Sequence, residues 1–200
     1  FYTPPDLAEK MVAASGIADH RAVVRARAGD RFGRPLALEP SVGEGALAVA
    51  LIKAAAGQVA LTACDTDEVA LKVAEPAIVA AYKAEGVKSP TYQIHTHDFL
   101  LVSAHDSVRY DFIVMNPPFT GGADMAHVMH AWKLLADGGT IVALTSPAWK
   151  TANTKAAIAF RDFVGIHSTA VEDIPKRTFE HTDIATVMLV LRKPAPPSSN

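Results

Sequence analysis

Apolar and polar residues alternate with two different periodicities along this chain. Short apolar or β-branched runs, typical of buried strands, occur at residues 36–38, 59–64, 92–96, 112–115, 140–145, 169–174 and 185–191. Alanine-rich stretches with helical spacing lie between them, at residues 46–56, 68–83, 124–136 and 155–163. This alternation predicts an α/β fold, in which helices cover both faces of a seven-stranded, mostly parallel sheet.

Turn and breaker residues refine this prediction. The last two apolar runs have no helix of length between them, so one strand should run antiparallel to its neighbours. Pro76 is expected to kink or break its helix, and Asp137-Gly138-Gly139 to end a helix and turn into the next strand. Pro4 and Pro5 precede a short amphipathic helix.

Composition limits the number of domains. Two hundred residues, 50% of them hydrophobic, fit one globular domain with a substantial core. We expect one domain over residues 1–193, with a helical cap element at 1–34, a flexible Pro- and Ser-rich tail at 194–200 and no target-recognition domain. The single cysteine, Cys64, rules out an internal disulfide. No apolar run approaches 18 residues and no leader pattern opens the chain, so neither membrane insertion nor secretion is expected.

The net charge of −2 does not indicate a strongly basic nucleic-acid surface. Five arginines nevertheless crowd one segment, at Arg21, Arg25, Arg27, Arg31 and Arg34. A solvated helix and loop is the simpler interpretation of this segment, and a few phosphate contacts are the alternative.

The turn Asn116-Pro117-Pro118-Phe119 directly follows the apolar run 112–115. Its two prolines fix φ, remove two backbone donors and keep the preceding residues out of the helical region. The resulting stiff corner presents the Asn116 amide oxygen and the Pro117 carbonyl as acceptors beside the ring of Phe119. Two acceptors and an aromatic face suit a planar amine. The alternative is an ordinary Asn-Pro turn that closes a strand.

A glycine-containing loop and three acids mark the ends of the first three strands. The first strand leads into Glu39-Pro40-Ser41-Val42-Gly43-Glu44-Gly45, where the glycines allow a tight turn before a helix. Asp65 ends the second strand and could accept both hydroxyls of a ribose, while Asp98 follows the third and could accept from an adenine amine. Ligands bind at this edge of open α/β sheets. Each acid alone could instead cap a helix.

The loop also matches the dinucleotide fingerprint, as Gly43-x-Gly45-x-x-Ala48, which leaves an NAD-dependent oxidoreductase as an alternative. Glu39 argues against it, because a carboxylate at the strand end would repel a pyrophosphate. The same carboxylate would suit a cofactor that carries an ammonium group and no phosphate, such as S-adenosylmethionine.

On these motifs the chain resembles class I S-adenosylmethionine-dependent amino-methyltransferases of the N6-adenine DNA type, with motifs in the gamma order. The resemblance implies a Rossmann-like fold and assigns the site residues. The N-terminal element, Tyr2, Thr3 and Pro4, would touch the methionine carboxylate. The cofactor would also meet Glu39, Pro40, Ser41, Gly43, Gly45, Asp65, Asp98, Phe99 and Asn116. The catalytic turn would be Asn116, Pro117, Pro118 and Phe119, and Phe179 would stack on the target base with Phe119.

The implied reaction transfers a methyl group to N6 of adenine and leaves S-adenosylhomocysteine. Asn116 and Pro117 would accept both N–H groups of the amine and free its lone pair, on a base flipped out of the duplex. Phe179 could equally be a core residue. Asp65 stands where the family more commonly has Glu.

The implied setting is a cytoplasmic protein of a bacterium, phage or plasmid, in restriction-modification, with DNA as partner. Because no recognition domain is evident, base reading would come from a missing C-terminal portion or a subunit in trans, or selectivity would be low. The alternatives are methylation of an RNA base or a protein glutamine amide, and an inactive methyltransferase-like binding subunit. His95, His97, His127 and His130 invite a metal site, but no thiolate supports one and we predict no metal.

Overall fold

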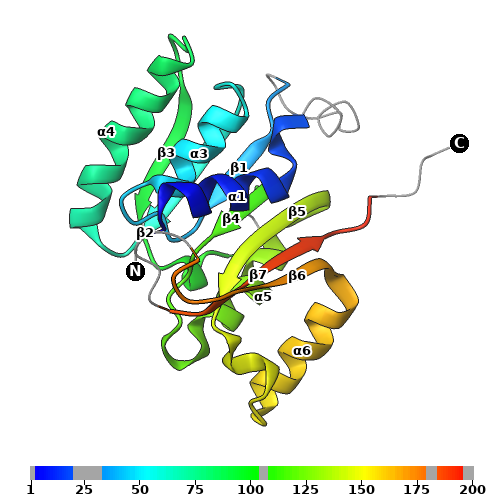
Figure 1. The fold of residues 1–200 in the computed structure, drawn as a ribbon. Coiled ribbons are helices and arrows are strands. Elements are labelled where there is room, and N and C mark those ends of the chain that lie inside the picture. Colours follow the sequence, from blue (N-terminus) through cyan, green and yellow to red (C-terminus); the bar gives the residue numbers. More distant parts are fainter. Residues whose placement is uncertain (1–2, 20–32, 104–107, 179–183, 196–200) are drawn as a thin grey trace, which may run out of the picture.

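A seven-stranded sheet with strand order β3-β2-β1-β4-β5-β7-β6 runs through the computed structural model (Figure 1). The structure describes residues 3–19, 33–103, 108–178 and 184–195. The strands are β1 Leu36–Glu39, β2 Ala60–Asp65, β3 Thr91–Thr96, β4 Tyr110–Met115, β5 Leu135–Thr145, β6 Ser168–Ile174 and β7 Thr186–Arg192. Strand β7 pairs antiparallel with both β5 and β6, while all other pairs are parallel. The predicted α/β architecture with one antiparallel strand is therefore confirmed.

Helices cover both faces of the sheet (Figure 1). They are α1 Pro5–Ser15, α3 Ala46–Ala54, α4 Glu68–Ala84, α5 Ala123–Leu134 and α6 Lys155–His167, with short 3-10 helices η1 Ile17–Asp19, η2 Phe99–Leu101, η3 Thr120–Gly122 and η4 Pro147–Lys150. One core cluster joins α1, α3 and α4 to the sheet, and a second joins α5 and α6 to its other face. Strand β4 contributes Phe112 and Val114 to the first cluster and Ile113 and Met115 to the second. This period of two explains why its sequence is apolar throughout.

The Gly138-Gly139 pair does not end a helix, contrary to the prediction. Helix α5 ends at Leu134, and Asp137-Gly138-Gly139 lies inside β5. The pairing with β4 passes from Tyr110–Leu135 to Phe112–Thr140, so β5 bulges between these pairs. Gly138 supplies the positive φ of 75°, and a Cβ on Gly139 would meet backbone oxygens at 2.8 and 3.0 Å. Bulged strands use glycine in this way.

Helix α4 continues through Pro76 without a break. Its N-terminus is fixed by Asp67, whose carboxylate accepts from the N–H groups of Val69 and Ala70. Ala74 and Ile78 on either side of the proline are fully buried in the first core cluster. Tertiary packing thus outweighs the loss of one helical hydrogen bond.

The predicted cap element is described only in part, as α1, η1 and residues 33–34. Four of its arginines, Arg21, Arg25, Arg27 and Arg31, lie outside the described residues, as does the end of the predicted tail, 196–200. Within the described part of the chain, no helix is long and apolar enough to cross a membrane.

Candidate active site

The Asn-Pro-Pro-Phe turn leaves β4 at the centre of the sheet. Strand β4 lies beside β1, while β2 and β3 lie on the far side of β1, so the direction of strand addition reverses between β1 and β4. Ligands of open α/β sheets bind outside the carboxyl ends of strands at such a switch point. The prediction of a site at this edge from motif positions therefore agrees with the topology.

The turn itself has a fixed geometry. Pro117 is buried, Pro118 is exposed, and Phe119 is half-buried against the core on the α1 side. Gly121 and Gly122 then take left-handed φ values of 64° and 79° and lead directly into α5. These residues bring the chain from a buried strand into a helix while the turn stays at the edge of the sheet.

The side chain of Asn116 is held by a hydrogen bond to Thr3, a residue near the start of the sequence. Its Nδ2 donates to the Oγ1 of Thr3 over 3.0 Å, although the two residues are 113 positions apart. Both side chains are half-buried. The hydrogen bond commits the nitrogen end of the amide to Thr3, so the oxygen end is left to act as an acceptor.

A cavity of about 420 Å³ extends from Asn116 along the glycine-containing loop. Its lining includes Thr3, Glu9, Glu39, Ser41, Gly43, Gly45 and Asn116. The carboxyl of Glu39, at the end of β1, is 1% exposed, and its Oε2 and the Oγ of Ser41 are buried without a hydrogen-bond partner. Buried polar atoms are normally paired, so two orphans in one cavity wall indicate a place for a polar ligand.

Burial raises the pKa of Glu39 well above its ordinary value. A hydrogen bond from the backbone of Ala48 acts in the opposite direction, and the nearby charge of Asp65 raises the pKa further. A cation placed in the cavity would favour the ionised carboxylate. Glu39 is thus suited to hold an ammonium group.

The two loop glycines are needed for backbone reasons. Gly45 has a φ of 93°, and a Cβ there would lie 3.2 Å from the Cα of Ala74 in α4. Gly43, with a φ of 50°, donates its N–H to Oδ2 of Asp65 over 2.8 Å. The loop is therefore tied to the end of β2 and packed directly on α4.

A second cavity, of about 720 Å³, continues on the other side of this loop. Ser41, Gly43 and Asn116 line both cavities. The second one also meets the remaining predicted residues of this edge: Pro40, Asp65, Asp98, Phe99, Pro117, Pro118 and Phe119. The structure therefore brings the loop, the acids and the turn together around two adjacent cavities that share Ser41, Gly43 and Asn116.

The acids also serve the backbone. Oδ1 of Asp65 accepts from the N–H of Asp67 over 3.0 Å, and Oδ1 of Asp98 accepts from the N–H of Leu100 over 2.9 Å, at the start of η2. Asp98 thus acts as an N-cap, as the alternative interpretation expected, whereas α4 is capped by Asp67. A carboxylate has about four lone-pair sites, so these bonds still leave acceptors for a ligand.

Two predicted site residues, Tyr2 and Phe179, lie outside the described residues. Near them in the sequence, Pro4 is buried and its carbonyl accepts from the N–H of Ala8 at the start of α1. Ile184, which is 47% exposed, lines the second cavity.

Two polar residues beside the turn were not predicted to belong to this site: His127, which was considered only as a metal ligand, and Asp124, which was not considered. His127 is 7% exposed and lines the second cavity, with Nδ1 2.7 Å from the carbonyl oxygen of Ala123. Asp124 is 1% exposed, and its Oδ2 accepts from the N–H of Ser146, which ties α5 to the end of β5. The spacing of His127 from the turn was the available signal, whereas Asp124 resembles any acid in a first helical turn. Among the described residues, no three His, Cys, Asp or Glu side chains are grouped so that they could hold a metal ion.

Three solved structures share this fold. The methyltransferase subunit of a type I restriction-modification system from Streptococcus thermophilus superposes with a TM-score of 0.72 at 18% identity, over 96% of this chain and 45% of that one. The type IIG restriction endonuclease BpuSI superposes with a TM-score of 0.70 at 17% identity, over 98% of this chain and 26% of its own. TrmN from Thermus thermophilus superposes with a TM-score of 0.57 at 20% identity, over 94% of this chain and 48% of its own. This chain thus spans less than half of each of the three.

Comparison with curated protein sequences gives no match. The family model of the methyltransferase small domain, in contrast, matches residues 37–168, from β1 to the start of β6. This range includes the glycine-containing loop, the three acids and the Asn-Pro-Pro-Phe turn, and it is well over half of the chain. The chain therefore belongs to the methyltransferase small domain family, and its cofactor is S-adenosylmethionine.

Proposed function

We propose that this chain transfers a methyl group from S-adenosylmethionine to an exocyclic amine, and that the amine is N6 of adenine in DNA. The observation that carries the proposal is the position of Asn116, between the two cavities and with the nitrogen of its amide committed to Thr3. DNA is favoured over RNA because the restriction-modification subunit and the type IIG enzyme superpose better than a putative RNA methyltransferase from Pyrococcus horikoshii, which gives a TM-score of 0.56.

The residues present fit the cofactor. The buried, unpartnered Oε2 of Glu39 would meet the ammonium group, with Ser41 beside it. Asp65 would accept from the ribose, and Asp98 and Phe99 would border the adenine. When bound, the cofactor supplies an electrophilic methyl group on a positively charged sulfur.

The turn residues would act on the amine. The Asn116 amide oxygen and the Pro117 carbonyl would each accept one N–H, which favours a pyramidal nitrogen with its lone pair freed from the ring. The two prolines hold both acceptors in place before the substrate arrives, so little reorganisation is needed. No strong base is required, since the nitrogen loses a proton readily once it carries the methyl group.

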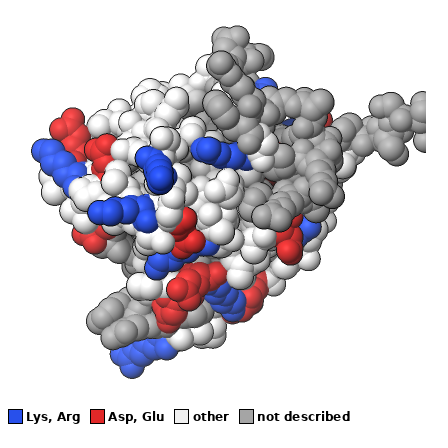
Figure 2. Space-filling view, turned by 90° about the horizontal axis from the view of Figure 1, so that it is seen from above, with Lys and Arg blue, Asp and Glu red and all other residues white. Residues whose placement is uncertain are grey.

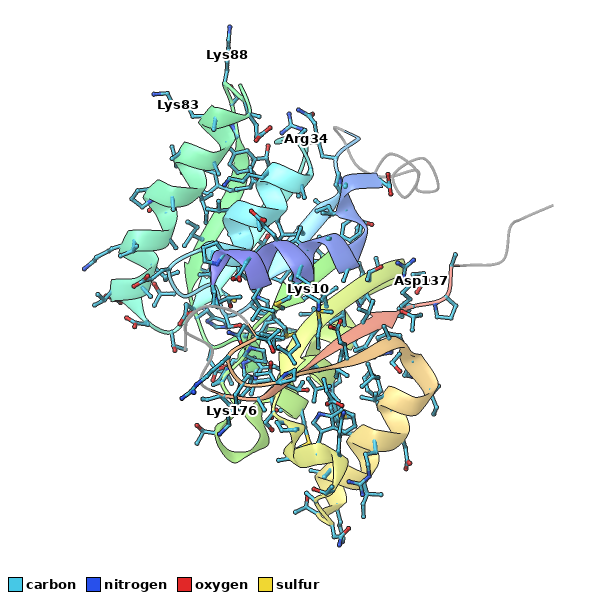
Figure 3. All side chains as sticks on the ribbon, in the orientation of Figure 1. Lys10, Arg34, Lys83, Lys88, Asp137 and Lys176 are labelled. Carbon is cyan, nitrogen blue, oxygen red and sulfur yellow. The ribbon has the colours of Figure 1, made fainter. Side chains whose placement is uncertain are left out.

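An adenine in a duplex would have to be flipped out to reach this turn. Phe119 and Phe179 are proposed as the two rings that stack on it. Two exposed cations, Lys176 and Arg177, follow β6 at the same end of the sheet, where Figure 3 labels Lys176. They are the proposed contacts for phosphates beside the flipped base.

The test is methyl transfer from labelled S-adenosylmethionine to separate DNA, RNA and protein pools, followed by identification of the modified nucleoside or residue. N6-methyladenine in DNA is expected. Label in an RNA base or in a protein glutamine would show that the substrate is RNA or protein and not DNA. No transfer to any pool would refute the proposal. The variant Asn116→Ala should lose transfer while cofactor binding, measured by calorimetry, stays as in the wild type.

A further inference from the structure

The side chain of Asn116 can face the substrate in two ways. One orientation presents its amide oxygen to the amine, and the other, turned by 180°, presents its NH₂ group. Only the first offers an acceptor to the N–H groups of an amine, because the second would set donor against donor. A residue that decides between the two orientations would therefore control the reaction without touching the substrate.

Thr3 holds one of these orientations in the structure. Nδ2 of Asn116 donates to its Oγ1 over 3.0 Å, so the oxygen end of the amide faces away from Thr3. Thr3 is itself fixed by the helix that follows it. Pro4 is buried, Leu7 and Met11 of α1 are in the core, and Lys10 forms an ion pair with Glu172 of β6.

We propose that Thr3 is a positioning residue for methyl transfer: its hydroxyl oxygen holds the Asn116 amide with Nδ2 toward α1 and Oδ1 toward the substrate nitrogen. This inference rests on the proposed function and adds a specific role for the first described residue of the chain. It differs from a contact to the methionine carboxylate, which the resemblance implied, because the partner here is the catalytic side chain.

The Thr3–Asn116 hydrogen bond lies outside the buried core. Thr3 and Asn116 are both half-buried and line a cavity that water can enter, so losing the bond leaves neither group unpaired in an apolar core. A purely structural role would thus appear in the melting temperature, whereas a positioning role appears in the rate of transfer.

The test compares three variants. Thr3→Val removes the hydroxyl at nearly constant volume, and Thr3→Ser keeps it. Thr91→Val is the matched control, since Oγ1 of Thr91 accepts from Arg34 over 2.9 Å and lies at the opposite end of β3 from the site. Single-turnover transfer to adenine in DNA is measured at saturating cofactor, and the cofactor Kd by calorimetry.

We expect Thr3→Val to slow transfer by about 10- to 100-fold, as small misplacements of catalytic groups do, with a cofactor Kd within about threefold of the wild type. Thr3→Ser should recover most of the rate, and Thr91→Val should leave it unchanged. If Thr3→Val weakens cofactor binding and transfers at the normal rate once saturated, Thr3 is a cofactor contact and the inference is wrong.

A second measurement needs no activity. In nitrogen-15 NMR spectra the side-chain NH₂ pair of Asn116 can be assigned by its loss in Asn116→Asp. Thr3→Val should shift this pair, while Thr3→Ser and Thr91→Val should not, and an unmoved pair in Thr3→Val would overturn the inference. If the wild type methylates no substrate, the proposed function is wrong; if it does and Thr3→Val matches it, only the role of Thr3 is wrong.

Discussion

Glu39 is the residue whose environment most constrains the chemistry of this site. Its buried carboxyl has a raised pKa, so the folded protein favours the protonated form. Stability from this group is fully present below its ordinary value of 4.5 and is lost as the pH rises through the higher folded value. We therefore expect the free energy of unfolding of the wild type to fall, relative to Glu39→Gln, as the pH rises above 4.5. Urea titrations at several pH values measure this difference, and parallel curves would contradict it.

The same residue predicts how cofactor binding depends on pH. A bound ammonium group favours the ionised carboxylate, so binding should release a proton and tighten as the pH rises above 4.5. Glu39→Gln should remove this dependence and weaken binding by about 10- to 100-fold, the range expected when a hydrogen bond to a charged group is lost. Calorimetry in buffers of different ionisation enthalpy reports the proton directly. Equal proton release by both proteins would show that another group titrates.

At the scale of elements, the glycine loop and α4 depend on each other. Gly45 combines a φ of 93° with a Cβ position 3.2 Å from the backbone of Ala74, whereas Gly86 has a φ of 74° and nothing within 4 Å. Gly86→Ala should therefore cost only the backbone strain, about 1–2 kcal/mol. Gly45→Ala should cost more and also weaken cofactor binding, because α4 or the loop must shift. Urea unfolding and calorimetry measure both effects, and equal losses in the two variants would mean that the contact with α4 is unimportant.

Most of the secondary structure and its order could be predicted from the sequence. Strands, helices and their order followed from apolar periodicity, most clearly for β1, β4 and β7, which are almost wholly buried. The motif residues were expected at one edge because the carboxyl ends of parallel strands meet there, and the structure places Glu39, Asp65 and Asn116 there. Their chemical roles are still predictions.

What the sequence could not predict depends on long-range contacts. The Thr3–Asn116 hydrogen bond joins residues 113 positions apart, and no local pattern signals it. The bulge in β5 was mistaken for a helix end, because a Gly-Gly pair supplies positive φ equally well in either setting. Pro76 was expected to kink or break its helix, and the helix does not break there because its neighbours are buried, which local propensity does not reveal.

At the scale of the whole molecule, basic side chains lie at both ends of the sheet. Figure 2 shows Lys and Arg mixed with Asp and Glu on the face seen from above, and Figure 3 labels Arg34, Lys83 and Lys88 at that end of the sheet. Lys176 is labelled at the opposite end, where the parallel strands finish and the candidate site lies. With a net charge of −2, the chain offers few phosphate contacts. We therefore propose that a recognition subunit or a further domain supplies sequence specificity.

This division predicts which cations bind DNA. Replacing Lys176 and Arg177 together by Ala should weaken binding of a duplex with a mismatched adenine and lower the slope of log K against log salt by about one per cation. The matched pair, Lys83→Ala with Lys88→Ala, removes the same charge from exposed positions at the other end and should leave both quantities unchanged. Fluorescence anisotropy at several salt concentrations measures them. Both double variants change the net charge equally, so an equal loss of DNA affinity would mean that the field of the whole molecule attracts DNA. A loss of affinity in the control pair alone would place the DNA at the wrong end of the sheet for transfer at Asn116.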